Sequence, residues 1–173
     1  MPKQVDYLII GQGLAGSLLS WELIQQGCSI LLIDNQKENA SQIAAGVINP
    51  ITGMRLVKNK DIDTLLPSAT QTYQELSEFF QQDFYIEKPI LRILCNEKEV
   101  DKFHQRIQNQ DYRHYLQTEL KPATESIQAP LGIMQQKQTG YLLTQKLLRC
   151  LKNFLQEKQS YQATQFEYQD LQI

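Results

Sequence analysis

The sequence predicts an α/β protein, in which parallel strands are joined by crossover helices. Three observations predict this class. A short apolar run, Val5–Ile10, is closed by a glycine, apolar residues then recur at helical spacing over Leu14–Gln26, and a second apolar run, Ser29–Asp34, follows. A strand, a helix and a strand within about thirty residues form a βαβ unit, whose strands are parallel and whose crossover is right-handed.

Each element of this unit has a local justification. The two apolar runs are short and rich in β-formers, as expected of strands buried in a parallel sheet. The helix between them is expected to end at Gly27, since glycine commonly terminates helices. After Asp34 the chain is polar, and it becomes small and apolar over Ile43–Ile48. Asn49–Gly53 is predicted to be a turn, because it combines a proline, which fixes φ, with a glycine, which tolerates positive φ.

The middle of the chain lacks the βαβ rhythm and is predicted to form a separate mixed layer. Its regular segments are two helical patterns and two strand patterns: Asp61–Gln82 and Glu97–Gln108, then Phe84–Leu94 and Gly132–Gln138. Near the C-terminus, Leu142–Gln156 is predicted to be a helix and Tyr161–Phe166 a strand. We place boundaries near Lys58 and Gly140 and expect a discontinuous domain of residues 1–58 and 141–173, with residues 59–140 inserted in it.

Composition excludes several classes of function. Seventeen Lys and Arg against nineteen Asp and Glu give a net charge of −2, so no basic excess favours nucleic acid. The apolar run Tyr7–Ile10 is far shorter than the roughly 18 residues of a membrane span, and the glycine-rich turn after it argues against a secretory signal. Cys28, Cys95 and Cys150 are odd in number and widely spaced, which predicts reduced thiols in a cytoplasmic protein and no metal site.

A glycine-rich motif lies between the first predicted strand and its helix. The segment Gly11-Gln12-Gly13-Leu14-Ala15-Gly16 is a G-x-G-x-x-G. In this motif the first glycine makes a tight turn, the second lets a pyrophosphate approach the backbone, and the third permits close packing of helix on strand. The pyrophosphate then lies at the helix N-terminus, where unpaired N–H groups and the helix dipole stabilise it. The motif therefore predicts a dinucleotide site.

An acidic residue completes this prediction. Asp34 ends the second predicted strand, eighteen residues after Gly16, where a carboxylate can accept hydrogen bonds from both hydroxyls of an adenosine ribose. The same carboxylate would repel a 2′-phosphate, which favours FAD or NAD over NADP. These features do not distinguish FAD from NAD, so a Rossmann-like FAD/NAD(P)-binding domain is the prediction at this point.

The next segment carries a resemblance to a known family. Ser41-Gln42-Ile43-Ala44-Ala45-Gly46-Val47-Ile48-Asn49-Pro50 resembles the second flavin-contact loop of the D-amino-acid oxidase and glycine oxidase superfamily. The following residues, up to Lys58, resemble a bacterial branch of FAD-dependent oxidoreductases in that superfamily. Gly140-Tyr141-Leu142 resembles the point where such chains re-enter the FAD domain. The resemblance is good over residues 1–58, loose over 140–173, and nearly absent between them.

The resemblance implies FAD as the cofactor and the residues that contact it. For the ADP half it implies the residues of the glycine turn and the acid after the second strand: Gly11, Gly13, Leu14, Ala15, Gly16 and Asp34. For the pyrophosphate, the ribityl chain and the ring it implies a second set, with the last member beside the isoalloxazine: Ser41, Ala44, Ala45, Gly46 and Val47.

The implied reaction is oxidation of an amine or amino acid by hydride transfer to the flavin, with a small-molecule substrate. No Ser-His-Asp set, carboxylate pair or metal-ligand set stands out, so no catalytic residue is assigned. Arg55 and Lys58 are considered as partners of an anionic group. Five tyrosines are considered for a substrate wall, although aromatic residues in such a layer are more often core: Tyr73, Tyr85, Tyr112, Tyr115 and Tyr141.

Two other functions remain open: a nicotinamide-binding dehydrogenase or redox partner, and a dinucleotide-binding module without turnover. The resemblance also implies that similar chains are about twice as long. We therefore expect residues 1–173 to be an N-terminal portion without amine-oxidase turnover, with Val5–Ile10 left uncovered on one side. An exposed apolar strand favours association, so self-association or weak FAD binding is expected. Robust peroxide production by a monomer of this chain would contradict that expectation.

Overall fold

The computed structural model describes residues 4–167 and 169, and these residues form two compact units. One unit contains the described residues up to Gly46 together with those from Leu143 onward, and the other is Val47–Leu142. The chain thus leaves the first unit once and returns to it, as the predicted insertion requires. The compact units divide at Val47 and Leu143, whereas the sequence predicts boundaries near Lys58 and Gly140. The division into an FAD-binding domain and a substrate domain stays a prediction.

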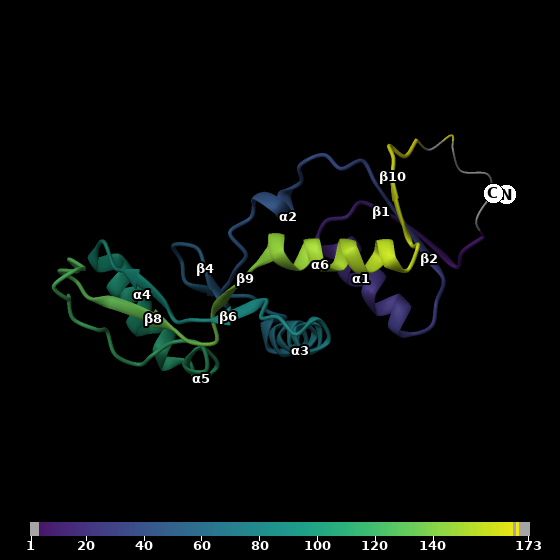
Figure 1. The fold of residues 1–173 in the computed structure, drawn as a ribbon. Helices are drawn as coiled ribbons and strands as arrows, with labels where there is room; N and C mark the ends of the chain where they lie inside the picture. Colours follow the sequence, from purple (N-terminus) through teal and green to yellow (C-terminus); the bar gives the residue numbers. More distant parts are fainter. Residues whose placement is uncertain (1–3, 168, 170–173) are drawn as a thin grey trace. The chain divides into compact units, whose positions relative to one another are not determined.

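The first unit is built on a parallel three-stranded sheet (Figure 1). Its strands are β1 (Tyr7–Ile10), β2 (Ile30–Asp34) and β10 (Tyr161–Ala163), in the order β1-β2-β10. β2 is the central strand, and Tyr7 pairs with Ile30 on one side of it while Tyr161 pairs with Leu32 on the other. The predicted βαβ unit and the predicted C-terminal strand are both confirmed, the latter in a shorter form.

Two helices make the crossovers of this sheet. α1 (Leu14–Gln25) joins β1 to β2, and α6 (Thr144–Glu157) precedes β10. Right-handed crossovers that progress in one direction across a sheet place their helices on the same face. α1 and α6 accordingly lie side by side in Figure 1, and the rings of Trp21 and Phe154 pack with centroids 5.2 Å apart. The fold is therefore of the α/β class and Rossmann-like, as the sequence predicts.

The second unit contains three helices and only antiparallel strand pairs among its described strands. The helices are α3 (Ile62–Phe80), α4 (Glu97–Gln108) and α5 (Gln110–Arg113). The strands form a sheet in the order β3 (Val47–Ile48), β9 (Gly140–Leu142) and β6 (Tyr85–Glu87), and two pairs, β4 (Ile51–Thr52) with β5 (Val57–Lys58) and β7 (Ile90–Ile93) with β8 (Ile133–Gln136). Fully buried side chains such as Leu94, Phe103 and Met134 form its core.

Several local predictions in this unit need correction. The single strand predicted over Phe84–Leu94 is two strands in different sheets, because Lys88 and Pro89 interrupt it and proline donates no ladder hydrogen bond. The turn predicted over Asn49–Gly53 lies further along, since Ile51–Thr52 is already a strand and the bend follows it. The helix predicted from Leu142 starts at Thr144, because the residues before it form β9.

Candidate functional site

The glycine turn has the backbone conformation that its sequence predicts. Gly11 has φ +99°, a value that L-residues with a side chain rarely adopt. Its N–H donates to the carbonyl of Ile33 at 2.8 Å, which ties the turn to the end of β2. The tight turn after β1 therefore needs glycine at this position.

Gly16 has a packing reason for lacking a side chain. A Cβ built on Gly16 would lie 2.2 Å from the carbonyl oxygen of Gly11 and 3.4 Å from Cγ2 of Ile9. The first distance is far inside van der Waals contact, and the obstacle is backbone rather than a flexible side chain. The close approach of α1 to the preceding turn thus depends on a glycine in the first turn of the helix.

The N-terminus of α1 is polar and begins at a glycine. The N-cap residue, Gly13, is in extended conformation and has no side chain that could cap the helix. The N–H of Leu14 donates to Oγ of Ser41 at 3.0 Å, so an oxygen already accepts at this helix terminus. A Cβ on Gly13 would lie 3.3 Å from that Oγ, with no other described atom within 4 Å outside the adjacent residues, so a side chain here would press on the Ser41 hydroxyl.

Asp34 is held at the same end of the sheet. Its Oδ1 accepts from the N–H of Gln12 at 2.9 Å, and its Oδ2 accepts from the N–H of Gln36 at 2.8 Å. Each carboxylate oxygen has two lone-pair sites, so further hydrogen bonds can be accepted after these two. The carboxylate is therefore oriented by the turn itself and retains capacity for a pair of hydroxyls.

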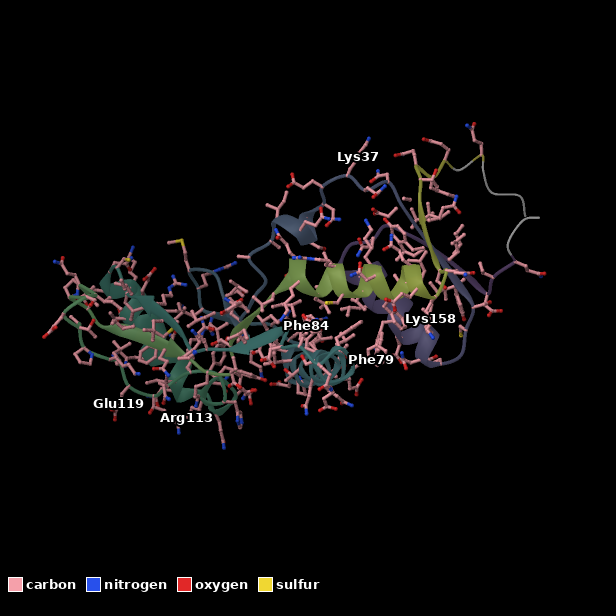
Figure 2. All side chains as sticks on the ribbon, in the orientation of Figure 1. Lys37, Phe79, Phe84, Arg113, Glu119 and Lys158 are labelled. Atoms are coloured by element: carbon pink, nitrogen blue, oxygen red, sulfur yellow. The ribbon has the colours of Figure 1, made fainter. Side chains whose placement is uncertain are left out.

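Ser41 reaches the turn from a short helix. α2 (Ala40–Ile43) begins with a capping box, in which the Asn39 side chain accepts from the N–H of Gln42 and the Gln42 side chain accepts from the N–H of Asn39. From α6, the Gln145 amide donates to the carbonyl of Gln42 at 2.8 Å. Figure 2 shows Lys37 on the loop that joins β2 to α2, with its side chain directed into solvent. This loop therefore places a hydroxyl, and not a cation, against the helix N-terminus.

Four other residues are predicted to contact the cofactor beyond its ADP half, and they follow Ser41 in the chain. Ala44 and Ala45 are exposed after α2, and Gly46 has φ +68°. Val47 is exposed too, and it pairs with Tyr141 in the sheet of the other unit. The structure thus brings the glycine turn, Asp34 and Ser41 together, while a role for residues 44–47 toward a cofactor stays a prediction.

The tyrosines considered for a substrate wall are mostly core. Tyr73, Tyr112 and Tyr115 are buried, and only Tyr85 and Tyr141 are partly accessible. Burial, together with the hydrogen bond that the Tyr115 hydroxyl donates to Asp63 at 2.5 Å, raises the pKa of Tyr115 to about 12. The result is a structural network, since the same carboxylate is also bonded at 2.6 Å by the ammonium group of Lys58.

The same network fixes the position of the Lys58 side chain. Its ammonium lies 5.4 Å from the centre of the Tyr115 ring and bonds to Asp63, and the hydrogen bonds from Lys58 and from the Tyr115 hydroxyl lower the pKa of Asp63. The cation is therefore engaged within the second unit.

Within residues 4–167 and 169, no group of three His, Cys, Asp or Glu is arranged to hold a metal ion, and no helix is long and apolar enough to cross a membrane.

The sequence reasoning missed Gln12. It occupies a variable position of the motif, and nothing in the pattern singles it out. In the structure its side chain is 5% exposed and is hydrogen-bonded to α6, while its backbone is bonded to Asp34. A long polar side chain at a motif position where a small residue would suffice is the signal that could have found it.

Comparison with known proteins identifies the family. A model described as FAD dependent oxidoreductase matches residues 6–166, nearly the whole chain. The chain belongs to this family. Its cofactor is accordingly FAD, and the glycine turn, the helix N-terminus with its serine hydroxyl and the oriented Asp34 carboxylate fit the ADP half of that cofactor.

Solved structures at 16–18% identity share the fold of this chain. The L-amino acid deaminase of Proteus myxofaciens, solved with anthranilate, matches at TM-score 0.69 and 16% identity, over 94% of this chain and 38% of its own. Glycine oxidase of Geobacillus kaustophilus matches at TM-score 0.69 and 18% identity, over 91% and 45%. Iminodiacetate oxidase of Chelativorans sp. BNC1 matches at 0.64 and 17%, over 89% and 45%. The chain thus spans less than half the length of these enzymes.

Proposed function

We propose that this chain binds FAD with its ADP half on the glycine turn and takes part in the oxidation of an amine or amino acid. The observation that carries the proposal is the geometry of the turn. A helix N-terminus whose N-cap is a glycine, a serine hydroxyl held against it and an oriented carboxylate lie at one end of a parallel sheet. Ligands of such sheets bind at the carboxyl ends of the strands.

Each residue of the turn has its own part in the proposal. At the start of α1 the N–H of Ala15 binds the pyrophosphate directly, the N–H of Leu14 holds the Ser41 hydroxyl beside it, and Gly13 leaves room for it. Asp34 accepts from the adenosine ribose. Ser41, which accepts from the N–H of Leu14, still has a hydroxyl hydrogen to donate to a phosphate oxygen. Gly11 and Gly16 act indirectly, because they allow the turn and the close approach of the helix.

The remaining cofactor contacts and the substrate are proposed from the family. Ala44, Ala45, Gly46 and Val47 follow the ribityl chain toward the ring, where small side chains let a flat group lie against backbone. FAD, when bound, accepts the hydride that leaves the substrate. Enzymes of this fold include a glycine oxidase and an iminodiacetate oxidase, which supports an amine or amino acid as the substrate class.

The wider context follows the same proposal. Residues 59–140 are proposed to supply part of the substrate layer, while residues 1–58 and 141–173 supply the FAD-binding part. A cytoplasmic location is supported by three free cysteines, Cys28, Cys95 and Cys150, since reduced thiols are usual there. The net charge of −2 offers no electrostatic basis for a nucleic-acid partner.

The experiment is a pair of titrations of the purified chain, with FAD and with NAD, read by quenching of flavin fluorescence and by calorimetry. We expect saturable binding of FAD and at least tenfold weaker binding of NAD. Tighter binding of NAD would favour the dehydrogenase or redox-partner alternative. Binding of neither nucleotide by a folded chain would contradict the proposed cofactor site.

A further inference from the structure

Gln12 joins the glycine turn to a helix that lies far along the chain. Its Nε2 donates to the carbonyl oxygen of Leu148 in α6 at 2.8 Å and lies 3.4 Å from Oγ of Ser17 in α1. The side chain is 5% exposed and Ser17 is fully buried. Burying a primary amide is unfavourable unless its hydrogen bonds are made, so this arrangement is a specific one.

The backbone of the same residue orients the acid of the site. The N–H of Gln12 donates to Oδ1 of Asp34 at 2.9 Å. The side-chain bond to α6 therefore fixes a peptide whose N–H holds one oxygen of the carboxylate. The other oxygen is held by the N–H of Gln36, within the loop that follows β2.

We propose that Gln12 is a positioning residue for the cofactor, which acts by anchoring the glycine turn to α6 and thereby setting the orientation of Asp34. This inference rests on the proposed FAD site. It adds that the affinity for FAD depends on a helix that enters the unit only after residues 47–142. The contact spans 136 residues of sequence, so the site is complete only when both parts of the discontinuous unit have folded together.

The test is a set of variants at position 12 in the 173-residue chain, with FAD affinity and thermal stability measured side by side. Gln12→Met keeps the length of the side chain and removes its hydrogen bonds, whereas Gln12→Ala also removes its volume. Gln26→Ala is the matched control, because that glutamine is exposed and its amide bonds only to Glu22 at the other end of α1. We expect about tenfold weaker FAD binding for Gln12→Met and unchanged binding for Gln26→Ala.

A double-mutant cycle separates positioning from a general loss of stability. If Gln12 acts through the acid, Gln12→Met weakens FAD binding much less in an Asp34→Asn background than in the wild type. Wild-type affinity for Gln12→Met would overturn the inference, and so would a loss that is fully additive with Asp34→Asn. Absence of FAD binding by the wild-type chain would instead contradict the proposed function, and this inference would be lost with it.

Discussion

Substitution of two glycines, one at the N-cap and one in the first turn of α1, should separate packing from cofactor binding. In Gly16→Ala the new Cβ would lie 2.2 Å from the Gly11 carbonyl oxygen, whereas Cβ contacts essentially never fall below 3.0 Å. The carbonyl is difficult to move, because Gly11 is bonded through its N–H to Ile33 and the next N–H is bonded to Asp34. Relief therefore requires α1 to shift away from the turn.

The magnitude follows from two opposing contributions. Overpacking costs about 1–3 kcal/mol, and the higher helix propensity of alanine returns up to about 1 kcal/mol. Because the obstacle is backbone, overpacking should cost about 2–3 kcal/mol, which leaves a net loss of about 1–2 kcal/mol and lowers Tm by about 2–8 °C for a chain of this size. Gly13→Ala is the matched control: Gly13 has φ −78°, and its Cβ would meet only the Ser41 hydroxyl, at 3.3 Å.

The assay is thermal unfolding by circular dichroism, followed by FAD titration of the same samples. Gly16→Ala should melt below the wild type, and Gly13→Ala should melt within about 2 °C of it but bind FAD more weakly. A Gly16→Ala variant as stable as the wild type would refute the close contact between α1 and the turn.

Four further outcomes are expected. Asp34→Asn should weaken FAD binding by roughly 1–3 kcal/mol in a calorimetric titration, and unchanged affinity would remove the ribose assignment. Gly13→Val should abolish FAD binding while the circular dichroism spectrum stays native, and normal flavin content in the folded variant would exclude the pyrophosphate from this turn. Because the pKa of Tyr115 is raised from 10.0 to about 12, the free energy of unfolding in urea should fall between about pH 10 and 12, and Tyr115→Phe should make that fall smaller without abolishing it, since burial also raises the pKa of Tyr73 and Tyr85. Sedimentation should detect self-association that Ile10→Lys reduces, since Ile10 is 55% exposed on β1, which pairs with one strand among those described; a monomer at every concentration would contradict this.

The parts of the fold that the sequence predicts are those with local signals. α4 occupies the predicted range, Glu97–Gln108. The helix is amphipathic, and the Asn96 side chain caps it by accepting from the N–H of Glu99. The βαβ unit is predicted for a similar reason, since strand, glycine turn and helix follow one another within a short segment. Long-range pairing has no such signal. Nothing in the sequence indicates that Gly140 lies in a strand beside β6, where a Cβ would lie 2.4 Å from the carbonyl oxygen of Ile86.

In the candidate site, too, the local motif is predictable from the sequence and the long-range contacts are not. The positions of Gly11, Gly16 and Asp34 follow from the motif and its spacing; the geometry agrees with a tight turn at Gly11 and close packing at Gly16, while ribose binding by Asp34 stays a prediction. The approach of Ser41 to Leu14 was implied only by resemblance, because a loop brings it back across 27 residues. The bond from Gln12 to Leu148 could not be predicted, since it depends on where α6 packs after an insertion of about a hundred residues, near the usual size of a domain.

The location of the ADP half of FAD is the central claim, and backbone amide resonances recorded during a titration with ADP test it most directly. If the pyrophosphate lies at the N-terminus of α1 and the ribose on Asp34, the largest shift changes should fall on residues 12–16 and 34–36, with residues 97–108 of the other unit unaffected. Saturable changes that are centred elsewhere, with the amides of Gly13, Leu14 and Ala15 unmoved, would contradict the account.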